Sequence, residues 1–177
     1  MGKEDREALP PFFISMKRAF TLIELMIVVA VIGMLLAMLI PRVSLLIDRA
    51  REKTTAKNLK TIYSAIITYS DRDYGRIIWP EDASSLRDIL TSEVDNIKML
   101  DRIPYALLRR GCTNNHMYEN SNDIYNASDY DFSVIDISVR NHGGWVYISS
   151  GRLKGEVFIN ASNIDTFGIP YSSYPCW

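Results

Sequence analysis

The chain has 177 residues and an almost balanced charge, with 20 basic and 21 acidic side chains and a net charge of −1 at pH 7. Its length suits one globular domain plus one spanning helix, since domains usually have about 100 to 150 residues. The charge balance argues against nucleic acid or anionic lipid as a general partner, because proteins that bind them usually carry a positive excess or basic blocks.

An uninterrupted apolar segment lies near the N-terminus. Residues 25–40 carry no charged or polar side chain. A helix over 20–40 is about 31 Å long at about 1.5 Å per residue, which matches a bilayer core of about 30 Å. Glu24 lies just inside this segment, where a carboxylate costs about 2.5 to 3.5 kcal/mol on insertion scales. An acid at this depth therefore points to a function.

The residues around this acid form a specific pattern. Lys17-Arg18-Ala19 precedes the sequence Phe-Thr-Leu-Ile-Glu-Leu at 20–25, and the apolar run that follows contains Gly33 and ends before Pro41. This combination resembles the N-terminal processing and methylation segment of type IV pilins and type II secretion pseudopilins. The family usually has glycine at the position of Ala19, and alanine is similarly small.

The resemblance implies a processing pathway and a set of partners. A membrane-embedded prepilin peptidase would cleave between Ala19 and Phe20, and the new Phe20 amine would be methylated. Glu24 of one subunit would meet the Phe20 amine of the next while the helices assemble into a filament core. Further partners would be other copies or homologous pilin-like subunits, an inner-membrane assembly platform and membrane lipid. The chain would be a single-pass protein of the bacterial inner membrane with a periplasmic head, assembled into a periplasmic or surface filament.

Two other interpretations of the apolar segment fit less well. A removed secretory signal has an apolar region of 7 to 15 residues followed by an A-x-A-like site, which residues 41–44 do not offer. A plain single-pass anchor explains the length, but leaves Glu24 and the pattern at 17–25 unexplained.

Residues 1–19 form the expected prepilin leader. They mix both charges and contain two consecutive prolines, so we expect no regular structure. Translation from Met16 instead of Met1 would give a very short basic leader. Basic residues flank both ends of the apolar segment, so the positive-inside rule does not decide the orientation.

Residues 41–70 are expected to continue the helix of residues 20–40 into a globular head. Pro41 should kink or locally melt the helix, because it removes one backbone hydrogen bond and clashes with the preceding turn. Leu59, Ile62, Ile66 and Tyr69 recur at spacings of three and four, which predicts a buried apolar stripe.

A basic face accompanies this stripe, with the residues Arg49, Arg51, Lys53, Lys57 and Lys60. Such a face suits acidic lipid or DNA, but it is more often simply solvated. Because Asp48 and Glu52 interrupt it, we interpret it as a solvated face.

The remaining residues predict an α+β head, in which the helix packs on a small antiparallel sheet. Residues 71–131 read as a connecting region with short helices at 84–90 and 105–110 and a long loop over 111–131. Residues 132–160 read as an antiparallel β-meander with strands at 132–139, 145–149 and 156–160. Residues 161–177 form a C-terminal tail. The resemblance implies the same order of elements.

Cys112 and Cys176 are the only two cysteines. Neither His116 nor His142 supplies the spacing of a zinc site. A disulfide in an oxidising periplasm would close a loop of about 65 residues and stabilise the fold by up to about 4 kcal/mol in the chain-entropy model. The resemblance favours this disulfide, and the alternative is two unpaired thiols.

Clustered acids in the predicted loop raise the question of calcium. Asp123, Asp129, Asp131 and Glu119 are of the type that ligates hard cations. The loop motif associated with calcium in major pseudopilins is missing, so we assign no metal and no cofactor.

No catalytic motif is present, and we do not expect an enzyme. Two functions stay open. The first is a structural subunit of a type II secretion or type IV pilus filament. The second is a membrane-anchored periplasmic binding domain that does not polymerise.

Overall fold

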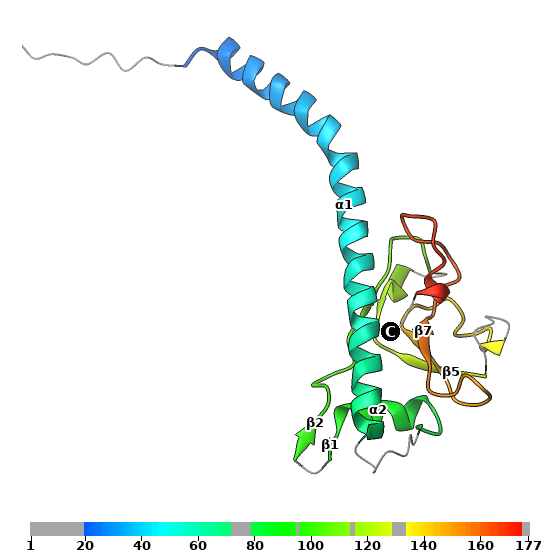
Figure 1. The fold of residues 1–177 in the computed structure, drawn as a ribbon. Coiled ribbons are helices and arrows are strands. Elements are labelled where there is room, and N and C mark those ends of the chain that lie inside the picture. Colours follow the sequence, from blue (N-terminus) through cyan, green and yellow to red (C-terminus); the bar gives the residue numbers. More distant parts are fainter. Residues whose placement is uncertain (1–19, 72–78, 95, 114–115, 129–133, 175–177) are drawn as a thin grey trace, which may run out of the picture. The chain divides into compact units, whose positions relative to one another are not determined.

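The computed structural model describes residues 20–71, 79–94, 96–113, 116–128 and 134–174 (Figure 1). The chain divides into two compact units, residues 1–40 and residues 41–177, and each is described by itself. A long apolar helix and a small mixed sheet make the fold α+β, as expected and as in pilin-like proteins.

The helix α1, Leu22–Asp71, has 50 residues and confirms the predicted helix from the apolar segment to about residue 70. By length and composition it is able to cross a membrane, with a mean hydropathy of 2.8 over its most apolar stretch. Pro41 lies inside α1 without interrupting it, so the expected local melting does not occur. A kink at Pro41 stays a prediction.

In the second unit, the predicted stripe on α1 forms one side of the core. Leu59, Ile62 and Ile66 are almost fully buried, and Tyr69 is partly buried. Toward the N-terminal end of the helix, the same buried face carries polar side chains in place of apolar ones. Its buried polar members are Glu52 and Thr55.

A second helix, α2 at Ala83–Thr91, confirms the short helix expected at 84–90. Asp82 caps it, since its Oδ1 accepts a hydrogen bond of 2.7 Å from the Ser85 N–H, a common way to satisfy a free donor at a helix start. Leu86 and Leu90 are buried in the same core cluster as the α1 stripe. Figure 1 shows α2 beside the C-terminal end of α1.

The strands are short and form three separate sheets. Two of these sheets are two-stranded antiparallel pairs, and the third has the order β5-β6-β7, with β5 parallel and β7 antiparallel to β6. The strands are β1 Glu93–Val94, β2 Ile97–Lys98, β3 Ala106–Leu107, β4 Asn120–Ser121, β5 Ile124–Ala127, β6 Trp145–Ile148 and β7 Val157–Ile159.

The expected antiparallel meander is only partly present. The strands predicted at 145–149 and 156–160 are the hairpin β6–β7, but the third strand is β5, which comes from the predicted loop. The described part of the predicted strand 132–139 forms turns. Its Asp136 Oδ1 accepts hydrogen bonds of 2.8 and 2.7 Å from the Ser138 N–H and hydroxyl, and such local bonds favour a turn over a strand.

Residues 105–110 also differ from the prediction, because they contain the strand β3 and no helical turn. Thr55 of α1 explains this locally. Its hydroxyl donates to the Leu107 carbonyl and accepts from the Leu107 N–H, both at 2.7 Å. The Thr55 side chain on α1 therefore takes the place of a neighbouring strand for Leu107 in β3. In the predicted loop 111–131, the structure has a 3-10 turn at His116–Tyr118 and the strands β4 and β5.

The strand β6 lies at the centre of the head and is buried on both faces. Trp145 and Tyr147 belong to the cluster that includes the α1 stripe and α2. Val146 and Ile148 belong to a smaller cluster on the other face. The Gly143 that precedes this strand has φ +76°, and a Cβ there would lie 2.1 Å from the Tyr118 carbonyl oxygen. The predicted turn before β6 therefore requires glycine.

The C-terminal tail is attached to α1 by hydrogen bonds. Glu52 accepts bonds of 2.9 Å from the Thr166 N–H and from the Tyr171 hydroxyl. Burial raises the pKa of Tyr171, and its contact with Cys112 and its bond to Glu52 act in the same direction.

The structure describes only one of the two cysteines of the predicted disulfide. Cys112 is buried, with its Sγ 3.8 Å from the Tyr171 hydroxyl. Cys176 lies outside the described residues, so its link to Cys112 stays a prediction.

Candidate functional site at the start of the apolar helix

The candidate site is the N-terminal end of α1. Ala19, the residue before the predicted cleavage, lies outside the described residues. Phe20 is 85% exposed and precedes the helix, which begins at Leu22. The side chains from 20 to 47 are all exposed. This end of the chain therefore presents its apolar surface to whatever surrounds it.

Thr21 and Glu24 form a reciprocal cap at this end. The Glu24 Oε2 accepts hydrogen bonds from the Thr21 N–H at 2.9 Å and from the Thr21 hydroxyl at 2.8 Å. In return, the Glu24 N–H donates to the Thr21 hydroxyl oxygen at 3.3 Å. This arrangement is a capping box, which satisfies two backbone donors that the first helical turn leaves free.

The cap occupies only one carboxylate oxygen of Glu24. Both bonds from Thr21 end on Oε2, and Oε1 has no hydrogen-bond partner among the described residues. The site thus holds a carboxylate in a defined position at the start of an apolar helix while one oxygen stays available. A cation from outside the chain is the group that such an oxygen would bind best.

The apolar surface of α1 is the second component of the site. Its residues from Leu22 to Ile40 are exposed, including large side chains at almost every position. An apolar helix of this length needs lipid or other apolar helices around it, because exposing each large side chain to water costs about 1.5 to 3 kcal/mol.

Comparison with known families decides what this end of the chain is. Residues 14–40 match the prokaryotic N-terminal methylation motif, the cleavage and methylation signal of prepilins. Residues 14–40 are a prepilin-type segment. No curated protein and no solved structure matches the chain.

The prepilin-type segment contains Ala19 and Phe20, which the sequence predicted for processing, and Glu24, which it predicted for assembly. It supports a pilin-like or pseudopilin precursor, and it implies processing by a prepilin peptidase and assembly with other pilin subunits. The candidate transmembrane helix in the same segment supports a membrane anchor.

One functional feature of the prepilin-type segment was missed at the sequence level. The pattern Thr-x-x-Glu at 21–24, directly before an apolar run, is the usual signature of a capping box. The structure adds two specific hydrogen bonds, so Glu24 has a role within its own chain whatever it contacts outside.

The acids considered for calcium have other contacts. Glu119 is buried and accepts a bond of 2.6 Å from the Gly111 N–H. Asp123 accepts from the Ser121 hydroxyl at 3.0 Å and pairs with Arg87 at 3.5 Å. The described residues contain no group of three or more potential metal ligands, and the other two loop acids lie outside them.

Proposed function

We propose that the chain is a structural subunit, and not an enzyme, of a filament of the type II secretion or type IV pilus class. In this proposal the peptidase cleaves between Ala19 and Phe20, and the new amine is methylated. The head lies in the periplasm until the subunit leaves the inner membrane and polymerises through residues 20–40, with the assembly platform and homologous subunits as partners.

The observation that supports this proposal most directly is the match of residues 14–40 to the methylation motif. The exposed apolar surface of α1 supports it as well. Lipid covers such a surface before assembly, and neighbouring helices replace the lipid afterwards. Assembly of this kind needs no catalytic group.

Glu24 supplies the proposed register between subunits. After cleavage, the Phe20 amine is a cation, and a carboxylate at membrane depth is tolerable when a cation pairs with it. The free Oε1 of Glu24 is available for the amine of the next subunit, while Oε2 keeps the cap with Thr21. The intramolecular cap and the intermolecular pair are therefore compatible.

Two measurements on cells that make the full-length chain test the proposal. One identifies the N-terminal residue of the mature protein, and the other examines material sheared from the cell surface. Mass spectrometry should find a methylated Phe20 at the N-terminus, and electron microscopy should find filaments. Ala19→Gly should be processed at least as well, whereas Ala19→Leu should block cleavage. A mature protein that keeps residues 1–19 and forms no filament would instead indicate a membrane-anchored periplasmic domain.

A further inference from the structure

The second unit carries its charges in two separate groups. Residues 42–69 of α1 contain six basic and two acidic side chains, a net charge of +4, whereas residues 70–177 contain ten basic and fifteen acidic side chains, a net charge of −5. The net charge of the whole chain is close to zero because a positive and a negative part of the second unit nearly cancel.

The structure makes the basic face of α1 continuous. Glu52 was expected to interrupt this face, but it is 2% exposed and bonded to Thr166 and Tyr171. At about 100° per residue, Lys53, Lys57 and Lys60 lie within about 60° of one another on the helix, and all three are exposed. We call these three residues the lysine stripe. The expected interruption of the basic face by Glu52 is therefore wrong, whereas the exposure of the three lysines agrees with a solvated face.

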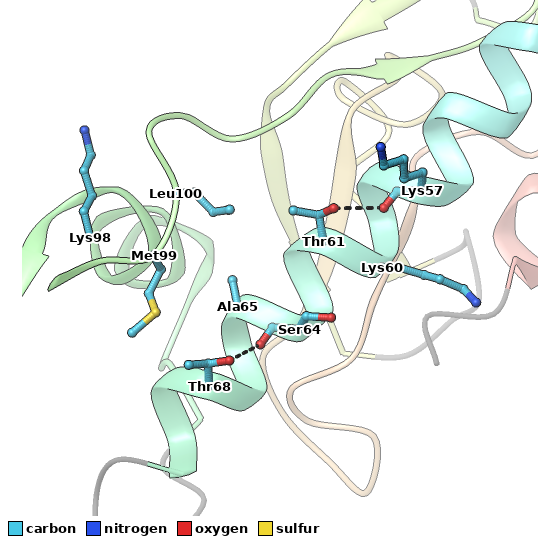
Figure 2. A pocket seen from close by; sticks show the side chains of 9 residues that line it. All are labelled: Lys57, Lys60, Thr61, Ser64, Ala65, Thr68, Lys98, Met99 and Leu100. Atoms are coloured by element: carbon cyan, nitrogen blue, oxygen red, sulfur yellow. Dashed lines mark hydrogen bonds between the residues drawn. The ribbon is translucent and has the colours of Figure 1, made fainter.

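An open groove of about 450 Å³ lies next to two residues of the lysine stripe, Lys57 and Lys60 (Figure 2). Lys57 and Lys60 line one side on α1, and Lys98 and Met99 line the other. Two hydroxyl groups in the groove are already used, since Thr61 donates to the Lys57 carbonyl at 3.1 Å and Thr68 to the Ser64 carbonyl at 2.8 Å. The apolar residues Ala65, Met99 and Leu100 also line the groove, and Figure 2 shows the Lys60 side chain pointing away from Lys98 and Met99.

Among the described residues, the cations of the stripe have no ion-pair partner. Among the described residues, the ion pairs are Arg87 with Asp123 and Lys98 with Asp101. Neither pair includes a lysine of the stripe. The positive field of this face is thus not neutralised within the part of the chain that the structure describes.

Two exposed acids, one just before α2 and one within it, are what we call the acidic surface of α2. Glu81, just before the helix, and Asp88, in its second turn, are exposed and have no ion-pair partner among the described residues. The one basic residue of α2, Arg87, is already paired with Asp123 at 3.5 Å. This surface therefore carries free negative charge of the kind that the stripe would attract.

We propose that the lysine stripe of one copy of this chain binds the acidic surface of α2 in the next copy. This inference rests on the proposed function, since it assigns a contact between neighbouring subunits. The contact joins two different surfaces, so a row of bound copies has a free stripe at one end and a free α2 at the other. Heterologous contacts of this kind generate open helical filaments when the rotation does not close.

The charge distribution favours a second copy over nucleic acid or lipid. A long polyanion such as DNA, or an anionic membrane, would also meet the acidic excess of residues 70–177, which repels it. A second copy presents both signs of charge in the complementary arrangement, which provides register and selectivity.

Charge reversal in the full-length chain, replacing the natural copy in its host, tests this proposal. Lys57→Glu with Lys60→Glu should lower the yield of sheared filaments at least about tenfold, since like charges then face each other. Glu81→Lys with Asp88→Lys should do the same. The combination of all four changes should restore most of the yield, because opposite charges face each other again.

A matched control changes the same charge elsewhere in the head. Arg152→Glu with Lys154→Glu, on the segment between β6 and β7, should leave the yield unchanged. Protease resistance of the head should be the same in all variants. If the double lysine reversal does not fold, Lys57→Gln with Lys60→Gln replaces it and should give a smaller loss of filament yield. Adding Glu81→Lys with Asp88→Lys to this neutral variant should lower the yield no further.

A second measurement separates this inference from the proposed function. Purified full-length protein in detergent should self-associate in a salt-sensitive way, by sedimentation, even where no filament forms. Filaments that need Glu24 but tolerate every stripe variant would overturn the inference and leave the proposed function intact. Failure of the fourfold variant to recover would also overturn it. A parallel loss of binding to phosphatidylglycerol vesicles or duplex DNA would then assign the stripe to that partner.

Discussion

Two glutamates on the same helix, Glu24 and Glu52, differ in where their hydrogen-bond partners lie in the chain. Glu24, in the apolar part of α1, bonds to Thr21 three residues away and is exposed. Glu52, in the head, is buried and bonds to Thr166 and Tyr171, more than 110 residues further along the chain. The same carboxylate therefore serves local helix capping in one region and long-range attachment in the other.

The difference has a physical cause. A residue at an exposed helix start finds its nearest donors in its own first turn, because those backbone groups have no helical partner. A carboxylate inside a core loses its water and is stable only where the tertiary fold supplies donors. In the proposed function, the role of Glu24 depends on a partner from another subunit, whereas Glu52 has its hydrogen-bond partners within its own head.

The largest expected effect comes from Glu24→Gln. Glutamine keeps the capping box, since its amide oxygen accepts the same bonds from Thr21, but it removes the charge that would attract the Phe20 amine of the next subunit. We expect normal insertion and cleavage and a complete loss of filaments, as judged by electron microscopy of sheared material.

The matched control is Thr21→Ala, which removes the cap and keeps the charge. It should cost about 1 kcal/mol of helix stability and leave filament yield close to normal. If Thr21→Ala abolishes filaments while Glu24→Gln does not, the residue acts only as a helix cap and the intermolecular pair does not exist.

Glu52→Ala should have the largest effect on stability. It removes the carboxylate acceptor of the buried Tyr171 hydroxyl and leaves the partly buried Thr166 N–H without its acceptor. A buried donor without a partner costs about 1 to 3 kcal/mol. We expect a loss of about 3 to 5 kcal/mol in the free energy of unfolding, measured by denaturant titration of the full-length protein with tryptophan fluorescence. Lys53→Ala, the exposed neighbour, should change it by less than about 0.5 kcal/mol. Equal effects of the two would contradict the role of Glu52.

Cys176→Ala tests the predicted disulfide in the same assay. Loss of the bond to Cys112 should lower the free energy of unfolding by about 2 to 4 kcal/mol, and non-reducing mass analysis of the natural protein should find the linked peptides. A reducing agent should lower the stability of the natural protein and leave that of Cys176→Ala unchanged. Two thiols that alkylate in the folded protein would rule the disulfide out.

The smallest expected effect concerns Tyr147, whose hydroxyl donates to the Pro80 carbonyl at 2.7 Å. Burial and the nearby Asp82 carboxylate raise the pKa of Tyr147 from its usual 10.0 to about 12. Because the folded state holds the proton more tightly, this contribution is fully present below pH 10 and is lost as the pH rises through 12. Tyr147→Phe should cost about 1 kcal/mol at neutral pH and reduce the alkaline loss of stability, as seen in unfolding titrations between pH 9 and 12.

The sequence alone determined the features that depend on local periodicity and composition. These include the apolar helix, its continuation to residue 71, the helix α2 and the hairpin β6–β7, because each carries its pattern within a few turns or one strand pair. The processing segment is also local, since a peptidase reads a short stretch around Ala19 and Phe20. The capping box at Thr21 and Glu24 was readable in the same way.

Only the tertiary structure decided the features that depend on residues far apart in the chain. The strands β3, β4 and β5 have two to four residues each, too few to show a period, and their pairing depends on partners such as Thr55 of α1. The segment containing Asp136 has strand-like composition, but its local hydrogen bonds favour turns. In the sequence, Glu52 resembles a surface acid. Only the tertiary structure shows that it is buried against the tail and is therefore not exposed beside the lysine stripe.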